Sequence, residues 1–168
     1  RCGSPQLDPT GVVYDAFGRL LDEFSTLLQD DFVHIGGDEV FSYKCWTSNA
    51  NVQKFMQDHN LTTELQLRSY FEQRVQEVSA QRQRSNLVWE EVFTSGSYLA
   101  PSTYVNVWLN YDSLKAAVTA GHKVVFSYGF YLDQQLPPGG THYLWVDTWR
   151  NFYLNEPFPD SALTPEQQ

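Results

Sequence analysis

The sequence predicts an α/β fold in which helices cover a parallel sheet. Helical and strand patterns alternate along much of the chain. The strand candidates are apolar throughout instead of alternating with polar residues, which is typical of parallel strands buried on both faces. With 168 residues and 42% hydrophobic content, the chain suffices for one domain core spanning residues 1–168.

The first predicted element is an amphipathic helix over residues 12–29. Apolar side chains recur there at helical spacing, with charged residues between them. These apolar residues are Val13, Phe17, Leu20, Leu21, Phe24, Leu27 and Leu28. The short apolar run at residues 32–35 then predicts a buried strand.

A long helical region follows, with one piece at residues 50–59 and another at residues 63–83. Thr62 or Thr63 is placed to cap the start of the second piece. One face of this second piece is apolar and consists of Leu67, Tyr70, Phe71, Val75 and Val78.

Three more apolar runs predict strands at residues 87–93, 104–108 and 123–128. The first two of these are joined by about ten residues, which is too short for a full helical crossover. A short helix is expected from Asp112, with Gly121 as its C-terminal cap, and another within residues 146–154. The total is four strands.

Composition excludes several classes of function. The formal net charge is −9, from 20 acids and 11 bases that are scattered along the chain, so binding to nucleic acid is not expected. No apolar run is long enough to span a membrane, and the N-terminus lacks the apolar core of a signal peptide. The two cysteines, Cys2 and Cys45, and the glycosylation sequon at Asn60 together favour the secretory pathway.

The motif Gly36-Gly37-Asp38-Glu39 leaves the predicted strand at residues 32–35. Neighbouring side chains of a strand point to opposite faces, so a strand would separate the two acids. The two glycines break the pleat, which allows Asp38 and Glu39 to face one pocket. On spacing alone, a simple glycine-acid turn remains open as the alternative.

The heptad His34-Ile35-Gly36-Gly37-Asp38-Glu39-Val40 resembles the H-x-G-G-D-E signature of family 20 glycoside hydrolases, the β-N-acetylhexosaminidases. Further segments resemble the animal lysosomal members in the same order. They are Cys45-Trp46-Thr47-Ser48-Asn49, Trp89-Glu90-Glu91-Val92-Phe93, Asn106-Val107-Trp108 and Tyr131-Leu132-Asp133. The shared order over nearly the whole chain makes this resemblance specific.

The resemblance implies a (β/α)8 TIM-barrel fold, of which the chain would contain about strands 4–7 with their helices. It implies no cofactor and no metal. A metal site built from His34, Asp38 and Glu39 is not expected, because these residues lie too close together on a strand. His34 is expected to be a structural histidine.

The resemblance also assigns roles to individual residues. Glu39 would be the general acid and later the general base, while Asp38 would orient the acetamido group of the substrate and stabilise the oxazolinium ion. Tyr131 would donate a hydrogen bond to the acetamido oxygen. Trp89 and Trp108 would wall the pocket, and Asp133 would bind sugar hydroxyls. Without the resemblance, the two tryptophans fit a core, Tyr131 a strand end and Asp133 a solvated loop.

The expected function is retaining hydrolysis of terminal β-linked N-acetylhexosamine residues from glycans or glycolipids. The expected context is a lysosomal or secreted glycoprotein, with a Cys2–Cys45 disulfide and a glycan at Asn60, acting as a subunit of a homo- or heterodimer. The alternative is a truncated, catalytically incompetent fragment or a non-catalytic relative that binds sugar or another subunit. Because an incomplete sheet exposes apolar edges, the isolated chain is expected to be poorly soluble or inactive.

Overall fold

The computed structural model describes residues 8–40, 44–132, 148–157 and 164, and four parallel strands form its sheet. In chain order these strands are β1 (Phe32–His34), β2 (Ser85–Trp89), β3 (Tyr104–Val107) and β4 (Val124–Phe126). Their spatial order equals their sequence order, β1-β2-β3-β4. Leu87 is the register partner of both His34 and Tyr104, and Val107 is the partner of Phe126. Sequential parallel neighbours are what part of a (β/α)8 barrel requires.

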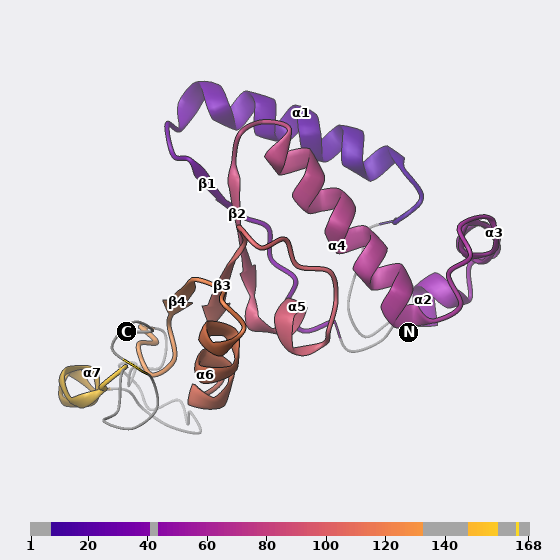
Figure 1. Cartoon of the computed structure of the whole chain (residues 1–168). Helices are drawn as coiled ribbons and strands as arrows, with labels where there is room; N and C mark the ends of the chain where they lie inside the picture. The colour runs from indigo at the N-terminus through magenta and orange to yellow at the C-terminus, as the bar shows by residue number, and fades with distance from the viewer. Residues whose placement is uncertain (1–7, 41–43, 133–147, 158–163, 165–168) are drawn as a thin grey trace, which may run out of the picture.

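Two long helices precede β2 and pack against each other on one side of the sheet (Figure 1). They are α1 (Val12–Leu27) and α4 (Glu64–Ala80), both predicted from their apolar spacing. Tyr14 and Leu21 of α1 meet Val75 and Val78 of α4 in a buried cluster, against which Val33 of β1 packs. This cluster holds the first strand to the helical layer.

The apolar face of α1 is only partly covered within the described residues. Leu27 is 70% exposed, and Phe24 and Leu20 are nearly half exposed. The prediction of a fully buried strand at residues 32–35 is also wrong, because Phe32 and His34 of β1 are exposed. The reason is position, since β1 stands at an edge of the described sheet and pairs there with β2.

Helix α4 begins with a capping box. The Thr63 hydroxyl oxygen accepts a hydrogen bond from the backbone N–H of Gln66, and the Gln66 side-chain oxygen accepts one from the backbone N–H of Thr63. Before it lie α2 (Lys44–Thr47), which the sequence did not predict, and α3 (Ala50–Asp58), which it did. Another apolar cluster, of Trp46, Val52 and Leu67, joins these three helices.

The link between β2 and β3 contains the one-turn helix α5 (Glu90–Thr94). The strand predicted over residues 87–93 was therefore too long, since β2 ends at Trp89 and the chain turns helical at Glu90. An apolar run alone does not distinguish a strand from a buried helical turn. The parallel connection therefore contains a single helical turn, in agreement with the expectation that it is too short for a full helical crossover.

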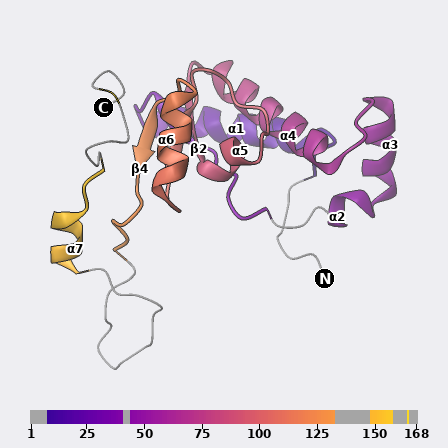
Figure 2. The ribbon, with the colours of Figure 1, turned by 60° about the horizontal axis from the view of Figure 1, so that its bottom comes forward.

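The remaining helices follow β3 and β4. Helix α6 (Tyr111–Thr119) packs Leu114 and Ala117 on Val105 and Val107 of the sheet. It ends as predicted at Gly121, whose φ of +87° favours glycine. Helix α7 (Trp149–Leu154) is set apart from the sheet and the other helices, and Thr148 caps its N-terminus (Figure 2).

Candidate active site

The acidic loop, residues 36–39, leaves the C-terminal end of β1 in a left-handed conformation. The φ angles are +78° at Gly36, +97° at Gly37 and +49° at Glu39. These angles break the pleat of the strand, as the two glycines predicted. A Cβ atom on Gly37 would lie 2.3 Å from Cγ2 of Val92, so close packing as well as backbone conformation requires glycine there.

Strand β2 and helix α4 hold the acidic loop in place. The backbone N–H of Trp89 donates to the carbonyl oxygen of Gly36 at 2.9 Å, which extends the β1–β2 ladder. On the helical side, Nη2 of Arg68 donates to the carbonyl oxygen of Gly37 at 2.7 Å. The backbone of the loop is thus anchored immediately before the two acids.

Asp38 and Glu39 are both exposed, and each has one identified neighbour in the site. The Asp38 carboxylate acts electrostatically on His34, whose ring lies 4.6 Å from that of Trp89. The backbone N–H of Glu39 donates to Glu91, which in turn binds the indole of Trp108. The loop that carries the two acids is therefore linked to Trp89 through His34 and to Trp108 through Glu91.

Four rings form a continuous row across the C-terminal ends of the strands, which we call the aromatic row: His34, Trp89, Trp108 and Tyr131. Ring centroids are 6.1 Å apart for Trp89 and Trp108, and 6.5 Å apart for Trp108 and Tyr131. Each of these last two pairs has an edge-to-face geometry, which is favourable for aromatic rings. Residues from β1, β2 and the segments after β3 and β4 are thereby brought together.

His34 makes structural contacts, in accordance with the role expected for it. Its Nδ1 accepts the backbone N–H of Gly36 at 3.1 Å, and Nε2 lies 3.5 Å from Nδ2 of Asn106. Partial burial lowers the pKa of His34, while the nearby Asp38 carboxylate raises it. A neutral imidazole fits the hydrogen bond it accepts from Gly36.

Trp108 is held in place by Glu90 and Glu91, two acids to which the sequence analysis assigned no role. The buried carboxylate of Glu90 accepts the backbone N–H groups of Trp108 and Leu109 at 2.7 and 2.9 Å. The Glu91 carboxylate accepts the indole Nε1–H of Trp108 at 3.0 Å. The signal in the sequence was a pair of acids directly after a strand-end tryptophan, but their targets lie seventeen or more residues away.

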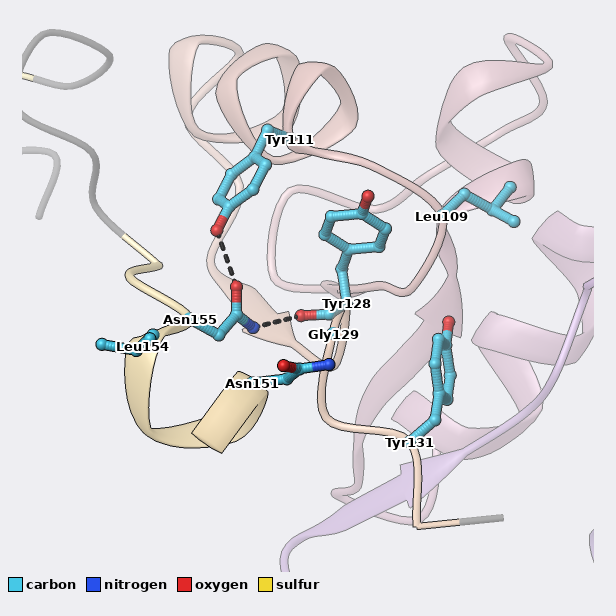
Figure 3. A pocket seen from close by; sticks show the side chains of 8 residues that line it. All are labelled: Leu109, Tyr111, Tyr128, Gly129, Tyr131, Asn151, Leu154 and Asn155. Atoms are coloured by element: carbon cyan, nitrogen blue, oxygen red, sulfur yellow. Dashed lines mark hydrogen bonds between the residues drawn. The ribbon is translucent and has the colours of Figure 1, made fainter. Parts of the chain in front are cut away.

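Tyr131 lines a cavity of about 640 Å³ beside the aromatic row (Figure 3). Figure 3 shows Tyr131 on one side of this cavity and Asn151, Leu154 and Asn155 on the other. Asn155 donates to the carbonyl oxygen of Tyr128 at 2.7 Å and accepts from the hydroxyl of Tyr111 at 2.9 Å. The Tyr131 hydroxyl itself donates to the backbone carbonyl of Trp108.

Several predicted residues stay untested. Asp133 and Cys2 lie outside the described residues, so the sugar contact and the Cys2–Cys45 disulfide remain predictions. Asn60 is exposed in a turn with φ of +55°, and its glycan remains a prediction too.

Among the described side chains, no group of three or more His, Cys, Asp or Glu is arranged to hold a metal ion. The helices of the described part are all too short or too polar to cross a bilayer.

Comparison with known proteins decides the family. The family model for the glycosyl hydrolase family 20 catalytic domain matches residues 4–168. The chain belongs to glycosyl hydrolase family 20. The site described above therefore carries the family 20 motif on the loop after β1, and the four strands belong to a family 20 TIM barrel.

Curated family 20 relatives are similar over nearly the whole chain. β-Hexosaminidase subunit A2 of Dictyostelium discoideum is 34% identical over 146 residues, covering 86% of this chain and 27% of the relative. The β subunit of the Rattus norvegicus enzyme is 34% identical over 168 residues, covering 98% of this chain and 29% of the relative. The chain thus spans less than a third of the length of either relative.

Solved structures of family 20 agree with this fold. The chitobiase of Flavobacterium johnsoniae superimposes with a TM-score of 0.75 at 32% identity, covering 98% of this chain and 24% of that protein. The β-N-acetylhexosaminidase of Bacteroides fragilis is similar in fold, with a TM-score of 0.72 at 22% identity over 89% of this chain and 31% of that protein.

Proposed function

We propose that the protein containing this chain hydrolyses terminal, non-reducing β-linked N-acetylglucosamine or N-acetylgalactosamine residues of glycoconjugates. The observation that carries this proposal is the family 20 match over residues 4–168, with Asp38 and Glu39 on a motif loop that the bond from Glu39 to Glu91 connects to Trp108. The relatives named as β-hexosaminidases support it. A non-catalytic relative is not favoured, because this chain retains both acids and Tyr131.

In the proposed reaction, the substrate supplies its own nucleophile. Its acetamido oxygen attacks the anomeric carbon, the glycosidic bond breaks, and Glu39 gives its proton to the departing oxygen. Glu39 then takes a proton from water, which attacks the anomeric carbon and reopens the oxazolinium ring. Two displacements at one carbon retain its configuration.

Asp38 accepts the acetamido N–H in this proposal and stabilises the positive charge that develops on the ring. Trp89 and Trp108 wall the space around the acetamido group. The Tyr131 hydroxyl, which donates to the carbonyl of Trp108 in the structure, turns to the acetamido oxygen and aligns it for attack. Asp133 completes the set by accepting hydrogen bonds from sugar hydroxyls.

The names of the relatives support a proposal on assembly, and the two cysteines with the sequon at Asn60 support one on cellular setting. We propose a lysosomal or secreted enzyme that works as a subunit of a dimer, since both curated relatives are named as subunits. Light scattering of the purified protein tests the dimer, and a monomer at all concentrations would contradict it.

The decisive test is Glu39→Gln in the form of the protein that hydrolyses phenyl N-acetyl-β-glucosaminide, whose leaving oxygen needs a proton. Loss of a general acid lowers kcat by about 10²–10⁴-fold, whereas binding of an oxazoline mimic should persist. Glu23→Gln on the exposed surface of α1 is the matched control and should keep full activity. A Glu39→Gln variant with nearly unchanged kcat refutes the assignment.

A further inference from the structure

The Glu91 carboxylate links the backbone of Glu39 to the indole of Trp108. One oxygen, Oε1, accepts the backbone N–H of Glu39 at 3.3 Å, and the other, Oε2, accepts Nε1–H of Trp108 at 3.0 Å. These partners lie 52 and 17 residues away in the chain. A single half-buried side chain of α5 thus connects the acidic loop after β1 with Trp108, the residue of the aromatic row that follows β3.

The backbone of Glu39 needs such support. Its φ of +49° lies in the left-handed region, which a residue with a Cβ atom adopts only when its surroundings hold it there. The bond from Glu91 fixes the N–H of this residue on one side. On the other side of the loop, Arg68 fixes the carbonyl oxygen of Gly37.

Both oxygens of Glu91 are acceptors for N–H donors, so the site is matched to a carboxylate. A glutamine would keep one acceptor oxygen and turn an NH2 donor toward either the Glu39 N–H or the Trp108 indole N–H. Glu90 accepts the backbone N–H of Trp108 but does not bind its indole ring, whose N–H donates to Glu91. The orientation of the indole and the conformation of Glu39 therefore depend on the same carboxylate.

We infer that Glu91 is a positioning residue, which sets the Glu39 carboxyl group against the pocket wall so that proton transfer to the leaving group is aligned. This inference rests on the proposed role of Glu39 as general acid. Glu91 touches no reacting atom and acts through the Glu39 backbone and the Trp108 ring. Misplacing a reacting group by about 1 Å can lower a rate by about 100-fold, so its loss should be visible in catalysis.

The test compares substrates whose leaving groups differ in their need for a proton. Phenyl N-acetyl-β-glucosaminide needs protonation of its leaving oxygen, whereas the dinitrophenyl analogue leaves as a stable anion. Glu91→Gln should lower kcat/KM, which reports the step that cleaves the glycosidic bond, by roughly 10- to 100-fold for the phenyl substrate and by less than about threefold for the dinitrophenyl substrate. Glu91→Asp, which keeps the charge but shortens the reach, should show the same selectivity.

A double-variant cycle separates positioning from a general structural role. In a Glu39→Gln background there is no acid to align, so adding Glu91→Gln should change the residual kcat/KM for the phenyl substrate little. Glu77→Gln is the matched control, since Glu77 is a half-buried carboxylate on α4 that pairs with Arg74 away from the site. It should leave the rates on both substrates unchanged.

The outcomes distinguish the two proposals. If Glu39→Gln itself shows no selectivity between the leaving groups, the proposed acid role of Glu39 fails. If Glu39→Gln is selective but both Glu91 variants lower the two rates equally, or lower neither, the positioning role of Glu91 is wrong.

Discussion

Arg68 lies behind the acidic loop and donates from Nη2 to the carbonyl oxygen of Gly37 at 2.7 Å. Its guanidinium Nε is 3.8 Å from Oε1 of Glu72 one helical turn later, and both side chains are buried. A buried ion pair on α4 therefore supports the backbone that carries Asp38 and Glu39.

Replacing Arg68 alone should destabilise the protein. Arg68→Met leaves the Glu72 carboxyl buried without its cation, at a cost of about 3–5 kcal/mol where Glu72 is ionised. The double variant with Glu72→Leu should recover most of the free energy of unfolding, because no charge then remains buried. Urea unfolding of the three proteins measures this. A double variant no more stable than Arg68→Met would contradict the explanation.

The two variants should also separate stability from activity. The double variant still lacks the donor to the Gly37 carbonyl, so its kcat should remain below that of the parent although its stability returns. Full recovery of both would mean that the bond from Arg68 to the loop has no effect on catalysis.

The stability of the protein should depend on pH through Glu72. Burial raises the pKa of Glu72 from 4.5 to about 7, against the opposing effect of Arg68. The folded protein thus binds this proton more tightly than the unfolded chain does. The resulting stabilisation is fully present below about pH 4.5 and is lost as the pH rises through about 7, amounting to at most roughly 3 kcal/mol.

Chemical unfolding of the parent and of Glu72→Gln between about pH 4 and pH 8 tests this dependence. The amide cannot ionise, so the variant should lack this component of the pH dependence. Equal slopes in the two proteins would show that Glu72 has an ordinary pKa in the fold.

Gly37 should tolerate no side chain. Gly37→Ala places a Cβ atom 2.3 Å from Cγ2 of Val92 and also strains a φ of +97°, which together should cost about 2–5 kcal/mol. Gly96→Ala is the matched control, with φ of +72° but open space around the new atom, and should cost only about 1–2 kcal/mol. Thermal unfolding compares them.

Adding Val92→Ala to Gly37→Ala removes the methyl group that the new Cβ meets. Because Val92 is fully buried, Val92→Ala alone is destabilising, but it should cost less in the Gly37→Ala background, where it also relieves the clash. If Gly37→Ala and Gly96→Ala melt alike, the contact with Val92 does not explain the glycine.

Tyr131→Phe should affect catalysis more than folding. Its hydroxyl donates to the carbonyl oxygen of Trp108, and the loss of one such hydrogen bond costs only about 1 kcal/mol of stability. If the same hydroxyl aligns the acetamido group, kcat should fall by about 10- to 100-fold. Steady-state kinetics on a nitrophenyl N-acetyl-β-glucosaminide measures this. Tyr153→Phe, on the exposed surface of α7, is the control and should be fully active.

Local signals in the sequence determined most of the elements. Helix α4 was expected from its apolar spacing and from the cap at Thr63, and the end of α6 from Gly121. Both depend on interactions within a few residues, which a sequence displays directly. In the acidic loop, too, the two glycines predicted a break in the strand pleat, and both have positive φ angles.

Tertiary structure alone decided the rest. The sequence from Leu87 onward did not indicate that a helix begins at Glu90. The groups that bind the buried Glu90 side chain lie after β3 and in α6, far along the chain. Likewise, the polar residues Arg68 and Glu72 of α4 face the interior although the pattern marked only an apolar face. Arg68 and Glu72 pair with each other, but the Gly37 carbonyl that Arg68 also binds lies 31 residues away in the chain.

The acids and aromatic residues of the candidate site could be named from motifs, but not the contacts between them. Glu91 meets Glu39 and Trp108 only because parallel strands bring three separate segments to the same edge of the sheet. Side-chain identity is written in the sequence, whereas distances between remote side chains are set by strand register and helix packing. That is why the residues of the site came from the sequence and the carboxylate that joins them came from the fold.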